Sequence, residues 1–270
     1  MTTAVGAVWS HRNALRLLVR RDLAVKYQAS VLGYFWSLIE PLAIGAIYWF
    51  VFGVLYGTGR HLGAAAESYP LFVVSGIFAW QWVNSAIGEA TNALTGQARL
   101  ITTMKVPREV FPFGRVIGRF AEYVAGLPIL IVVAIFYGQL TFGWHLLALP
   151  LAILLQFTLL IGLALLLSSL NVLLRDIDRF TRLITRFLFY ATPIIYPLSL
   201  VQESSMPGWV KALYECNPLV GIFQLFRAVW YPSEFPGTGV LAASVIGSLG
   251  LLLAGFWVFR RLEPAVLKEL

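Results

Sequence analysis

Residues 146–174, with the sequence LLALPLAILLQFTLLIGLALLLSSLNVLL, contain no charged side chain and decide the class of fold. A helix of about 20 apolar residues crosses the hydrocarbon core of a bilayer, so this run can span a membrane. The whole chain agrees: 59% of its 270 residues are hydrophobic, 12% are charged, and the mean hydropathy is +0.78. Soluble domains carry roughly 25% charged residues. The sequence therefore predicts an all-α membrane protein and excludes a soluble enzyme, a disordered chain and a disulfide scaffold.

Six stretches of the chain are long and apolar enough to be transmembrane helices, and we expect them to form one domain over residues 1–270. The fifth stretch is the weakest, because Pro193 and Pro197 interrupt it. The predicted transmembrane helices cover residues 35–56, 69–93, 114–137, 146–174, 183–200 and 239–259.

Residues 202–237, between the last two predicted spans, are rich in Pro, Gly and aromatic side chains. The apolar run 219–231 inside this segment is too short to cross a bilayer and carries Arg227 in its middle. We therefore expect an outer re-entrant or interfacial helical segment. Two short helices there could form an exit gate, or the segment could be a static cap.

The distribution of basic residues predicts the orientation. Lys and Arg are retained on the cytoplasmic side of membranes, and with six spans all but three of the 20 basic residues fall on one face. The three exceptions are Arg60, Lys211 and Arg227. Both termini are therefore expected in the cytoplasm. The net charge of +7 is then a topology signal, and nucleic acid is not an expected partner.

The segment 9–28, before the first span, has the pattern of an amphipathic interface helix. Arg12, Arg16 and Arg20 fall within about 120° of arc on a helix, with Leu15 and Leu18 on the opposite side. Such a helix lies in the headgroup layer of a membrane. It could serve only as an anchor, or it could also form a basic groove where an anionic lipid-linked substrate enters.

The residues of known catalytic sites are missing from the sequence. No Lys stands in a Walker A loop, no nucleophile elbow occurs, and Cys216 is the lone cysteine. The histidines lack metal-ligand spacing: they are His11, His61 and His145. The chain is therefore expected to be no enzyme and to hold no metal or cofactor of its own. Its energy would come from another subunit or from an ion gradient, and the lack of a convincing internal repeat disfavours the gradient.

A dense motif follows the amphipathic segment: Arg21-Asp-Leu-x-x-Lys26-Tyr27-x-x-Ser30-x-Leu32-Gly33-x-x-Trp36-x-x-x-x-Pro41. Three more follow in order along the chain: Arg175-Asp176, the run TPIIYP at 192–197, and Asn217-Pro218-Leu219 with Arg227. With these motifs the chain resembles ABC-2 type permeases that export polysaccharides, the Wzm-like subunits of O-antigen, capsule and teichoic-acid exporters. Within that family it looks most similar to exporters of lipid-linked galactan-type cell-wall polymers.

The resemblance implies partners and a location. Such permeases form homodimers in the bacterial inner membrane, and two copies of a separate cytoplasmic ABC ATPase bind below them. ATP and Mg²⁺ belong to that ATPase. A lipid-linked polysaccharide would be the substrate, surrounded by membrane lipids.

The resemblance also implies roles for three groups of residues. The residues of substrate uptake at the cytoplasmic mouth would be Arg20, Arg21, Lys26, Tyr27, Leu32 and Gly33. The aromatic residues of a sugar-conducting channel along the first and fifth spans would be Tyr48, Trp49, Phe52, Phe187, Tyr190 and Tyr196. Segment 96–112 would couple to the ATPase through Leu100, Ile101, Met104 and Lys105.

A polar stripe on the second span predicts a structural clamp. Residues from Gln81 to Asn92 recur there at three- and four-residue spacing and include Glu89. Arg119 and Glu122 share a face of the third span. Because polar groups in lipid must find partners, we expect Arg119 to pair with Glu89 or Glu122. A substrate role for these residues is the less favoured alternative.

Two other functions stay open at this stage. A small-molecule or drug exporter of the same ABC-2 type would share the motifs but bind small amphiphiles. A multi-pass membrane enzyme acting on lipid-linked sugars would need an acidic cluster. Asp176 and Asp178 are the only nearby pair, and Arg175, Arg179 and Arg182 around them favour a salt-bridged turn.

Overall fold

The computed structural model describes residues 10–28, 30–57, 68–103 and 106–269. These residues form helices joined by loops and turns, with no strand among them. This confirms the predicted all-α class. The helices are α2 (Arg12–Tyr27), α3 (Trp36–Tyr48), α4 (Tyr69–Thr91), α5 (Ala98–Thr103), α6 (Val110–Phe136), α7 (Ala148–Leu173), α8 (Ile177–Tyr190), α9 (Leu198–Gln202), α10 (Gly208–Glu215), α11 (Pro218–Ala228) and α12 (Thr238–Glu269).

Five helical stretches in the described residues are long and apolar enough to cross a membrane: Gly33–Leu55, Tyr69–Thr91, Val110–Phe136, Trp144–Leu173 and Thr238–Glu269. They correspond to five of the six predicted spans. Two have different bounds, since α6 begins before residue 114 and α12 continues past residue 259. Ion pairs join these extensions: Arg108 lies 2.6 Å from Glu263, and Arg260 lies 2.8 Å from Glu109.

The predicted fifth span, 183–200, is not one continuous helix. α8 begins earlier, at Ile177, and ends at Tyr190. The chain then runs through turns and bends to α9, which begins at Leu198. Pro193 and Pro197 explain the break, because proline lacks an N–H group and restricts the residue before it to extended conformations.

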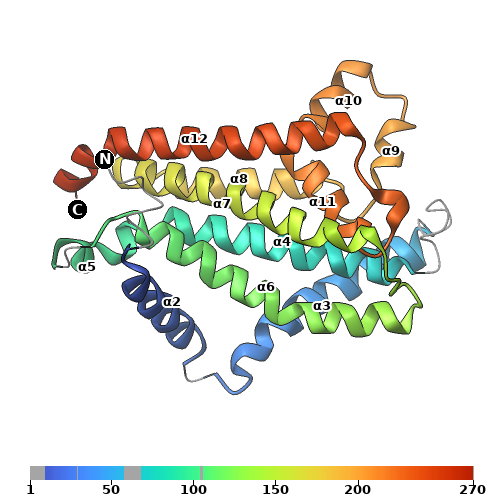
Figure 1. Ribbon diagram of the computed structural model, residues 1–270, viewed down its shortest axis with the longest axis horizontal. Coiled ribbons are helices and arrows are strands. Elements are labelled where there is room, and N and C mark those ends of the chain that lie inside the picture. Colours follow the sequence, from blue (N-terminus) through green and yellow to red (C-terminus); the bar gives the residue numbers. More distant parts are fainter. Residues whose placement is uncertain (1–9, 29, 58–67, 104–105, 270) are drawn as a thin grey trace.

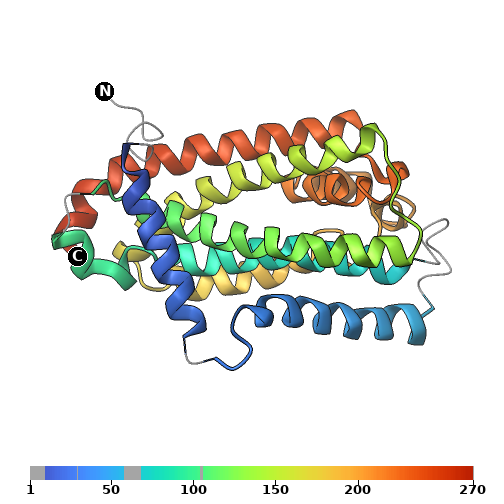
Figure 2. The same ribbon diagram turned by 60° about the horizontal axis from the view of Figure 1, so that its bottom comes forward.

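The helices lie along a common direction, with α2 crossing them near one end (Figures 1 and 2). That end also holds α5, the start of α8 and the end of α12, whereas α9 and α10 lie at the opposite end (Figure 1). The start of α2 and the end of α12 thus share one end. The stretch from α8 to α9 must therefore carry the chain along the bundle, although its helix is broken.

Helix α4 is the centre of the structure. It packs against α3, α6, α7, α8 and α11. Buried residues make up 78% of its most apolar window, against 11% for Gly33–Leu55. The polar stripe is the face of α4 that the bundle leaves uncovered, since Asn84 and Asn92 are exposed and Gln81, Ser85 and Glu89 are half-buried. The first span, in contrast, leaves most of its surface uncovered.

Helix α11 inserts between α4, α7 and α12, and every residue from Leu219 to Ala228 is buried. Pro218 occupies its first turn, and the side chain of Asn217 accepts a hydrogen bond from the Leu219 backbone N–H at 3.1 Å. Both features are typical of a helix start. The short apolar helix expected in segment 202–237 is thus present, and its role as a gate remains a prediction.

Arg227 of α11 donates hydrogen bonds to backbone carbonyls in the broken segment between α8 and α9. Its Nη2 donates to the Ile194 carbonyl at 2.6 Å and its Nη1 to the Tyr196 carbonyl at 3.2 Å. The guanidinium also lies 3.6 Å from the centre of the Phe72 ring. Arg227 has no exposed surface. Two carbonyls that lost their helical donors therefore receive a buried cation instead.

Two other side chains, those of Tyr69 and Asn217, also donate to this segment. We call the hydrogen bonds from Arg227, Tyr69 and Asn217 to its carbonyls the carbonyl clasp. The Tyr69 hydroxyl donates to the Ile195 carbonyl at 2.8 Å, and the Asn217 amide donates to the Ala191 carbonyl at 3.1 Å. At Gly76 of α4, a Cβ would come within 2.7 Å of the Ile194 oxygen, so a side chain there would push the broken segment away.

Helices α7 and α12 pack closely through two glycines. A Cβ built on Gly255 would collide with the carbonyl of Gly162, and a Cβ on Gly162 would collide with the carbonyl of Leu251. Small residues let membrane helices approach at backbone distance, where dispersion contacts are best.

We predict that Gly255→Ala lowers the free energy of unfolding by about 1–3 kcal/mol, the usual cost of overpacking. Gly250 on the same helix has open space around it, so Gly250→Ala is the matched control and should be neutral or stabilising. Thermal unfolding in detergent measures both. Equal melting temperatures for the two variants would contradict the close contact.

We predict that Arg227→Met lowers the free energy of unfolding by about 2–5 kcal/mol, because two buried carbonyls each lose a donor. Lys211→Met removes only an exposed hydrogen bond to the Gln202 carbonyl and should change stability little. Denaturant titration in detergent compares the variants. Wild-type stability of Arg227→Met would show that the carbonyls find other donors.

Candidate functional site

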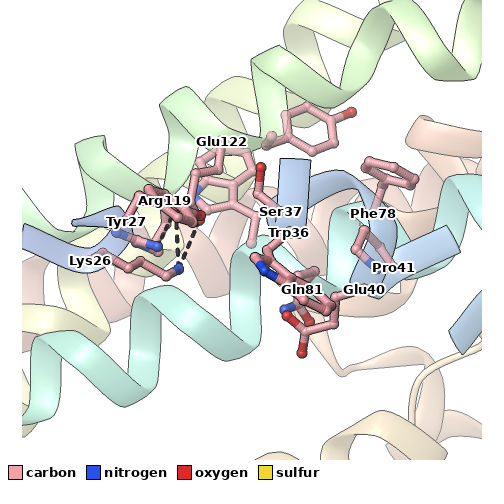
Figure 3. A pocket seen from close by; sticks show the side chains of 12 residues that line it. Lys26, Tyr27, Trp36, Ser37, Glu40, Pro41, Phe78, Gln81, Arg119 and Glu122 are labelled. Atoms are coloured by element: carbon pink, nitrogen blue, oxygen red, sulfur yellow. Dashed lines mark hydrogen bonds and ion pairs between the residues drawn. The ribbon is translucent and has the colours of Figure 1, made fainter. Parts of the chain in front are cut away.

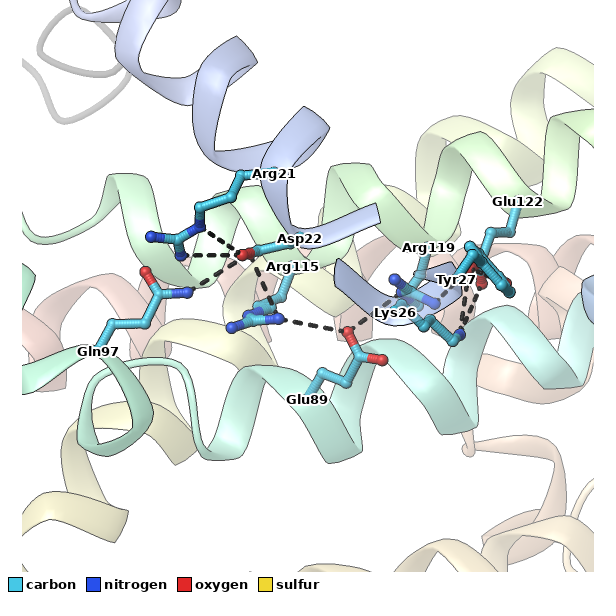
Figure 4. Close-up of polar contacts among 9 residues, drawn as sticks. All are labelled: Arg21, Asp22, Lys26, Tyr27, Glu89, Gln97, Arg115, Arg119 and Glu122. Carbon is cyan, nitrogen blue, oxygen red and sulfur yellow. Dashed lines mark hydrogen bonds and ion pairs between the residues drawn. The ribbon is translucent and has the colours of Figure 1, made fainter. Parts of the chain in front are cut away.

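A network of ion pairs joins α2 to α4 and α6 (Figure 4). Its first half centres on Glu122 of α6. The carboxylate accepts hydrogen bonds from Lys26 Nζ at 3.1 Å and from the Tyr27 hydroxyl at 2.5 Å, and it also pairs with Arg119. Arg119 Nε lies 3.2 Å from Glu89 Oε2. The structure thus brings Glu89, Arg119 and Glu122 together, and Arg119 pairs with both acids.

The second half of the network centres on Asp22, to which the sequence analysis gave no role. Asp22 lies 2.9 Å from Arg21 and 3.3 Å from Arg115 of α6, and it accepts a weak hydrogen bond from Gln97 at 3.4 Å. Its position one residue after Arg21 in the motif was the available signal. Asp22 and Glu122 together attach the amphipathic helix to the bundle.

The residues predicted for substrate uptake therefore differ in their surroundings. Arg20 is exposed, whereas Arg21 and Lys26 each have a carboxylate partner and keep part of their surface in solvent (43% and 38% of the side chain). Tyr27 is half-buried, and desolvation together with its bond to Glu122 raises the pKa of the hydroxyl. Tyr27 is thus a neutral donor at physiological pH.

Leu32 and Gly33, which are predicted to take part in substrate uptake, lie in the turn after α2. Gly33 has a φ of +48°, the left-handed region that favours glycine. Its N–H donates to the Ser30 hydroxyl at 3.1 Å, and Leu32 is exposed at the start of the turn. The chain turns here from the direction of α2 into α3 (Figures 1 and 2).

A cavity of about 60 Å³ lies where α2, α3, α4 and α6 meet (Figure 3). Lys26, Tyr27 and Glu122 line one side of it. Glu40 and Gln81 line another side and point away from the ion pairs (Figure 3).

Glu40 and Gln81 also line a much larger open groove, of about 610 Å³, between α3, α4 and α8. The groove is mixed in chemistry. It contains aromatic rings, amides and cations; its lining residues are Glu40, Ile44, Tyr48, Ile77, Trp80, Gln81, Asn84, Gly88, Arg182, Thr185, Arg186, Phe189 and Tyr190. Aromatic faces suit sugar rings, and amides and cations suit hydroxyl and anionic groups.

The six predicted channel aromatics do not lie together. Tyr48 and Tyr190 line the groove, and Phe52 stacks on Tyr48 with ring centres 5.9 Å apart. Trp49 lines a separate apolar pocket between α3, α4 and α6, because it follows Tyr48 on the next face of the helix. Phe187 is 69% exposed on the outer face of α8.

Tyr196, the sixth of these aromatics, lies in the broken segment. Its hydroxyl donates to the Tyr190 carbonyl at 2.5 Å and lies 3.0 Å from the Tyr214 hydroxyl of α10. Tyr196 therefore links the end of α8 to α10 and does not line the groove.

The predicted coupling segment, 96–112, contains α5 and the start of α6. Ile101 is buried in the hydrophobic core, so it does not present a docking surface as expected. The cause is the amphipathic character of α5: Leu100 packs against the same core, whereas Arg99 and Thr103 are exposed. Met104 and Lys105 lie outside the described residues.

After α7, the carboxylate of Asp178 is held by a hydrogen bond and an ion pair. Asp178 accepts from the Asn92 amide at 2.8 Å and pairs with Arg182 one turn along α8. Burial raises the pKa of this carboxyl, but these hydrogen bonds outweigh the effect and the net shift is downward. Asp178 is therefore ionised and occupied by partners, as expected for a structural turn.

Comparison with known proteins gives the family. The sequence pattern described as "ABC-2 type transporter" matches residues 13–231, which include the α2 network, the groove and the carbonyl clasp. The chain belongs to this family. The family predicted from the motifs is thereby confirmed.

Three relatives of this ABC-2 chain indicate how far the similarity extends. The O-antigen export system permease protein RfbA of Myxococcus xanthus is 29% identical over 259 residues, 96% of each chain. The protein of the same name from Klebsiella pneumoniae is 27% identical over 252 residues, 92% of each chain. The polysialic acid transport protein KpsM of Escherichia coli is 23% identical over 254 residues, 93% of each chain.

We predict that Glu122→Gln lowers the free energy of unfolding by about 2–4 kcal/mol, because Arg119, only 3% exposed, then loses one of its two carboxylates. Lys26→Met is the control, since Lys26 is half-exposed and its pair contributes about 0–1 kcal/mol. Thermal unfolding and proteolytic release of α2 measure the effect. If the two variants lose equal stability, Arg119 does not depend on Glu122.

Proposed function

We propose that the protein is the permease subunit of an ATP-driven exporter that moves a lipid-linked polysaccharide outward across a bacterial inner membrane. Support comes from the family, and from relatives whose names refer to O-antigen export and polysialic acid transport. Their similarity extends over almost the entire chain, so it concerns the whole permease rather than one motif.

The groove between α3, α4 and α8 is the observation that carries this proposal. A glycan presents hydroxyls and weakly apolar ring faces, and the groove offers Gln81 and Asn84 beside Tyr48, Trp80 and Tyr190. Pockets for small molecules are lined predominantly by apolar side chains. The mixed lining therefore favours a sugar polymer over the small amphiphiles that a drug exporter would bind.

The α2 network supports uptake of an anionic lipid-linked substrate from the cytoplasmic leaflet. Arg20, Arg21 and Lys26 keep exposed cationic surface on a helix that crosses the bundle at one end. A prenyl pyrophosphate headgroup is anionic, and arginine binds phosphate through two parallel hydrogen bonds. In this proposal both termini lie in the cytoplasm, at the end that holds α2 and α5.

The energy would come from a second protein. The sequence contains no Walker A loop, so ATP and Mg²⁺ would be bound by two copies of an ABC ATPase. The exposed residues of α5, Arg99 and Thr103, are the described part of its proposed docking site. Ile101 is excluded from that site because it is buried.

A homodimer fits the uncovered surface of the first and fifth passages. Phe180, Leu183 and Phe187 form an exposed apolar ridge on α8, and the first span is 11% buried. A second copy facing the groove would convert it into a channel. The six-span count of the membrane domain, with the broken fifth passage included, belongs to the same proposal. The assignment to a galactan-type polymer is supported only by the sequence motifs.

We predict that the double variant Tyr48→Ala, Tyr190→Ala lowers export by about tenfold or more, because two stacking faces are lost. Leu253→Ala, at an exposed position of α12 that lines neither the groove nor the proposed dimer ridge, should export at close to the wild-type rate. The measurement is ATP-dependent appearance of lipid-linked glycan on the outer side of vesicles that contain the permease and its ATPase. Transport of small amphiphiles but no glycan would overturn the proposed function.

A further inference from the structure

The groove contains cations that do not belong to the α2 network. Arg182 and Arg186 of α8 are one turn apart, so they project from the same side of the helix. Both line the groove, together with Gln81 and Asn84 of α4. This end of the groove is therefore a basic and amide-lined surface beside the aromatic rings.

The structure fixes Arg182 but leaves Arg186 available. Arg182 pairs with Asp178, which is held in turn by Asn92, and the Asn171 amide donates to Asn92 at 3.1 Å. Among the residues described, Arg186 forms no ion pair or hydrogen bond. Arg182 is thus neutralised and positioned, whereas the charge of Arg186 is uncompensated.

Glu40 is the one acidic residue among the described side chains that line the groove. It also lines the small cavity beside Lys26 and Glu122, where it points away from the ion pairs (Figure 3). Its carboxylate therefore lies between the α2 network and the α8 arginines. Because it lines the same groove as Arg186, this carboxylate would repel an anion bound there.

We propose that Arg186, with Arg182 beside it and Gln81 and Asn84 facing it from α4, forms an anion-binding site for a phosphate group. We call it the α8 anion site. The phosphate would belong to the lipid-linked glycan, and in this respect the inference rests on the proposed function. Two guanidinium groups one helical turn apart can each present paired N–H donors to phosphate oxygens.

A plainer explanation is that the α8 arginines only orient the chain in the membrane. Arg179 separates the two explanations, because it lies on the same helix, carries the same charge and does not line the groove. If the arginines only orient the chain, replacing Arg179 and replacing Arg186 should have the same effect on anion binding. A binding role would distinguish them.

The test is equilibrium binding of farnesyl pyrophosphate to the full chain with its ATPase in nanodiscs. Arg186→Gln should weaken binding about tenfold or more, and Arg186→Lys less, because lysine keeps the charge but loses the paired donors. Arg179→Gln is the matched control and should stay within about twofold of the wild type. Glu40→Gln should bind a few-fold more tightly, since it removes a repelling charge.

Two further probes identify the bound group. Inorganic pyrophosphate should compete with farnesyl pyrophosphate in the wild type but poorly in Arg186→Gln. Farnesol, which has the same tail without phosphate, should bind both proteins equally. Equal losses in Arg186→Gln and Arg179→Gln, or a loss of farnesol binding in Arg186→Gln, would overturn the α8 anion site.

The same samples separate this inference from the proposed function. If glycan export fails while pyrophosphate binding depends on Arg186, the α8 anion site stands and the proposed function falls. If export proceeds and binding is unchanged in Arg186→Gln, the function stands and the α8 anion site falls.

Discussion

Backbone polar groups buried away from water need hydrogen-bond partners, and the rest of this structure depends on how the broken segment between α8 and α9 finds them. Pro193 and Pro197 break the helix, which leaves carbonyls without their usual donors. Arg227 and Asn217 from segment 217–228, together with Tyr69 of α4, supply donors to them. The central position of α4 and the burial of α11 both follow, because each must lie against the break to reach it.

Helix α8, which precedes the break, supplies cationic and aromatic side chains to the groove. Thr181, Thr185 and Phe189 of α8 are buried, and Arg182 and Arg186 of the same helix line the groove. The α2 network lies on the other side of α3, and Glu40 and Gln81 line the cavities on both sides. An anionic substrate that moved from α2 to α8 would pass from one group of cations to another, with a single carboxylate between them.

Five of the long helices could be predicted from the sequence, because the length of an apolar run is a local property. The family could also be recognised from its sequence motifs. The pairing of Arg119 with acids followed from helical spacing, but Asp22 was missed because two of its partners, Arg115 and Gln97, lie far away in sequence. The burial of Ile101 and the glycine contact between α7 and α12 also depend on packing, which spacing within one helix does not reveal. Arg227 was noted as an exception to the charge rule, and only the structure gives it partners.

The carbonyl clasp also has a consequence for biosynthesis. The Ile194 and Tyr196 carbonyls receive their donors from Arg227, a residue that leaves the ribosome after them. Tyr69, by contrast, is already present when the fifth passage is made. The two hydrogen bonds from Arg227 therefore cannot form until α11 has been synthesised. The segment between α8 and α9 is thus completed only after a later part of the chain has been translated.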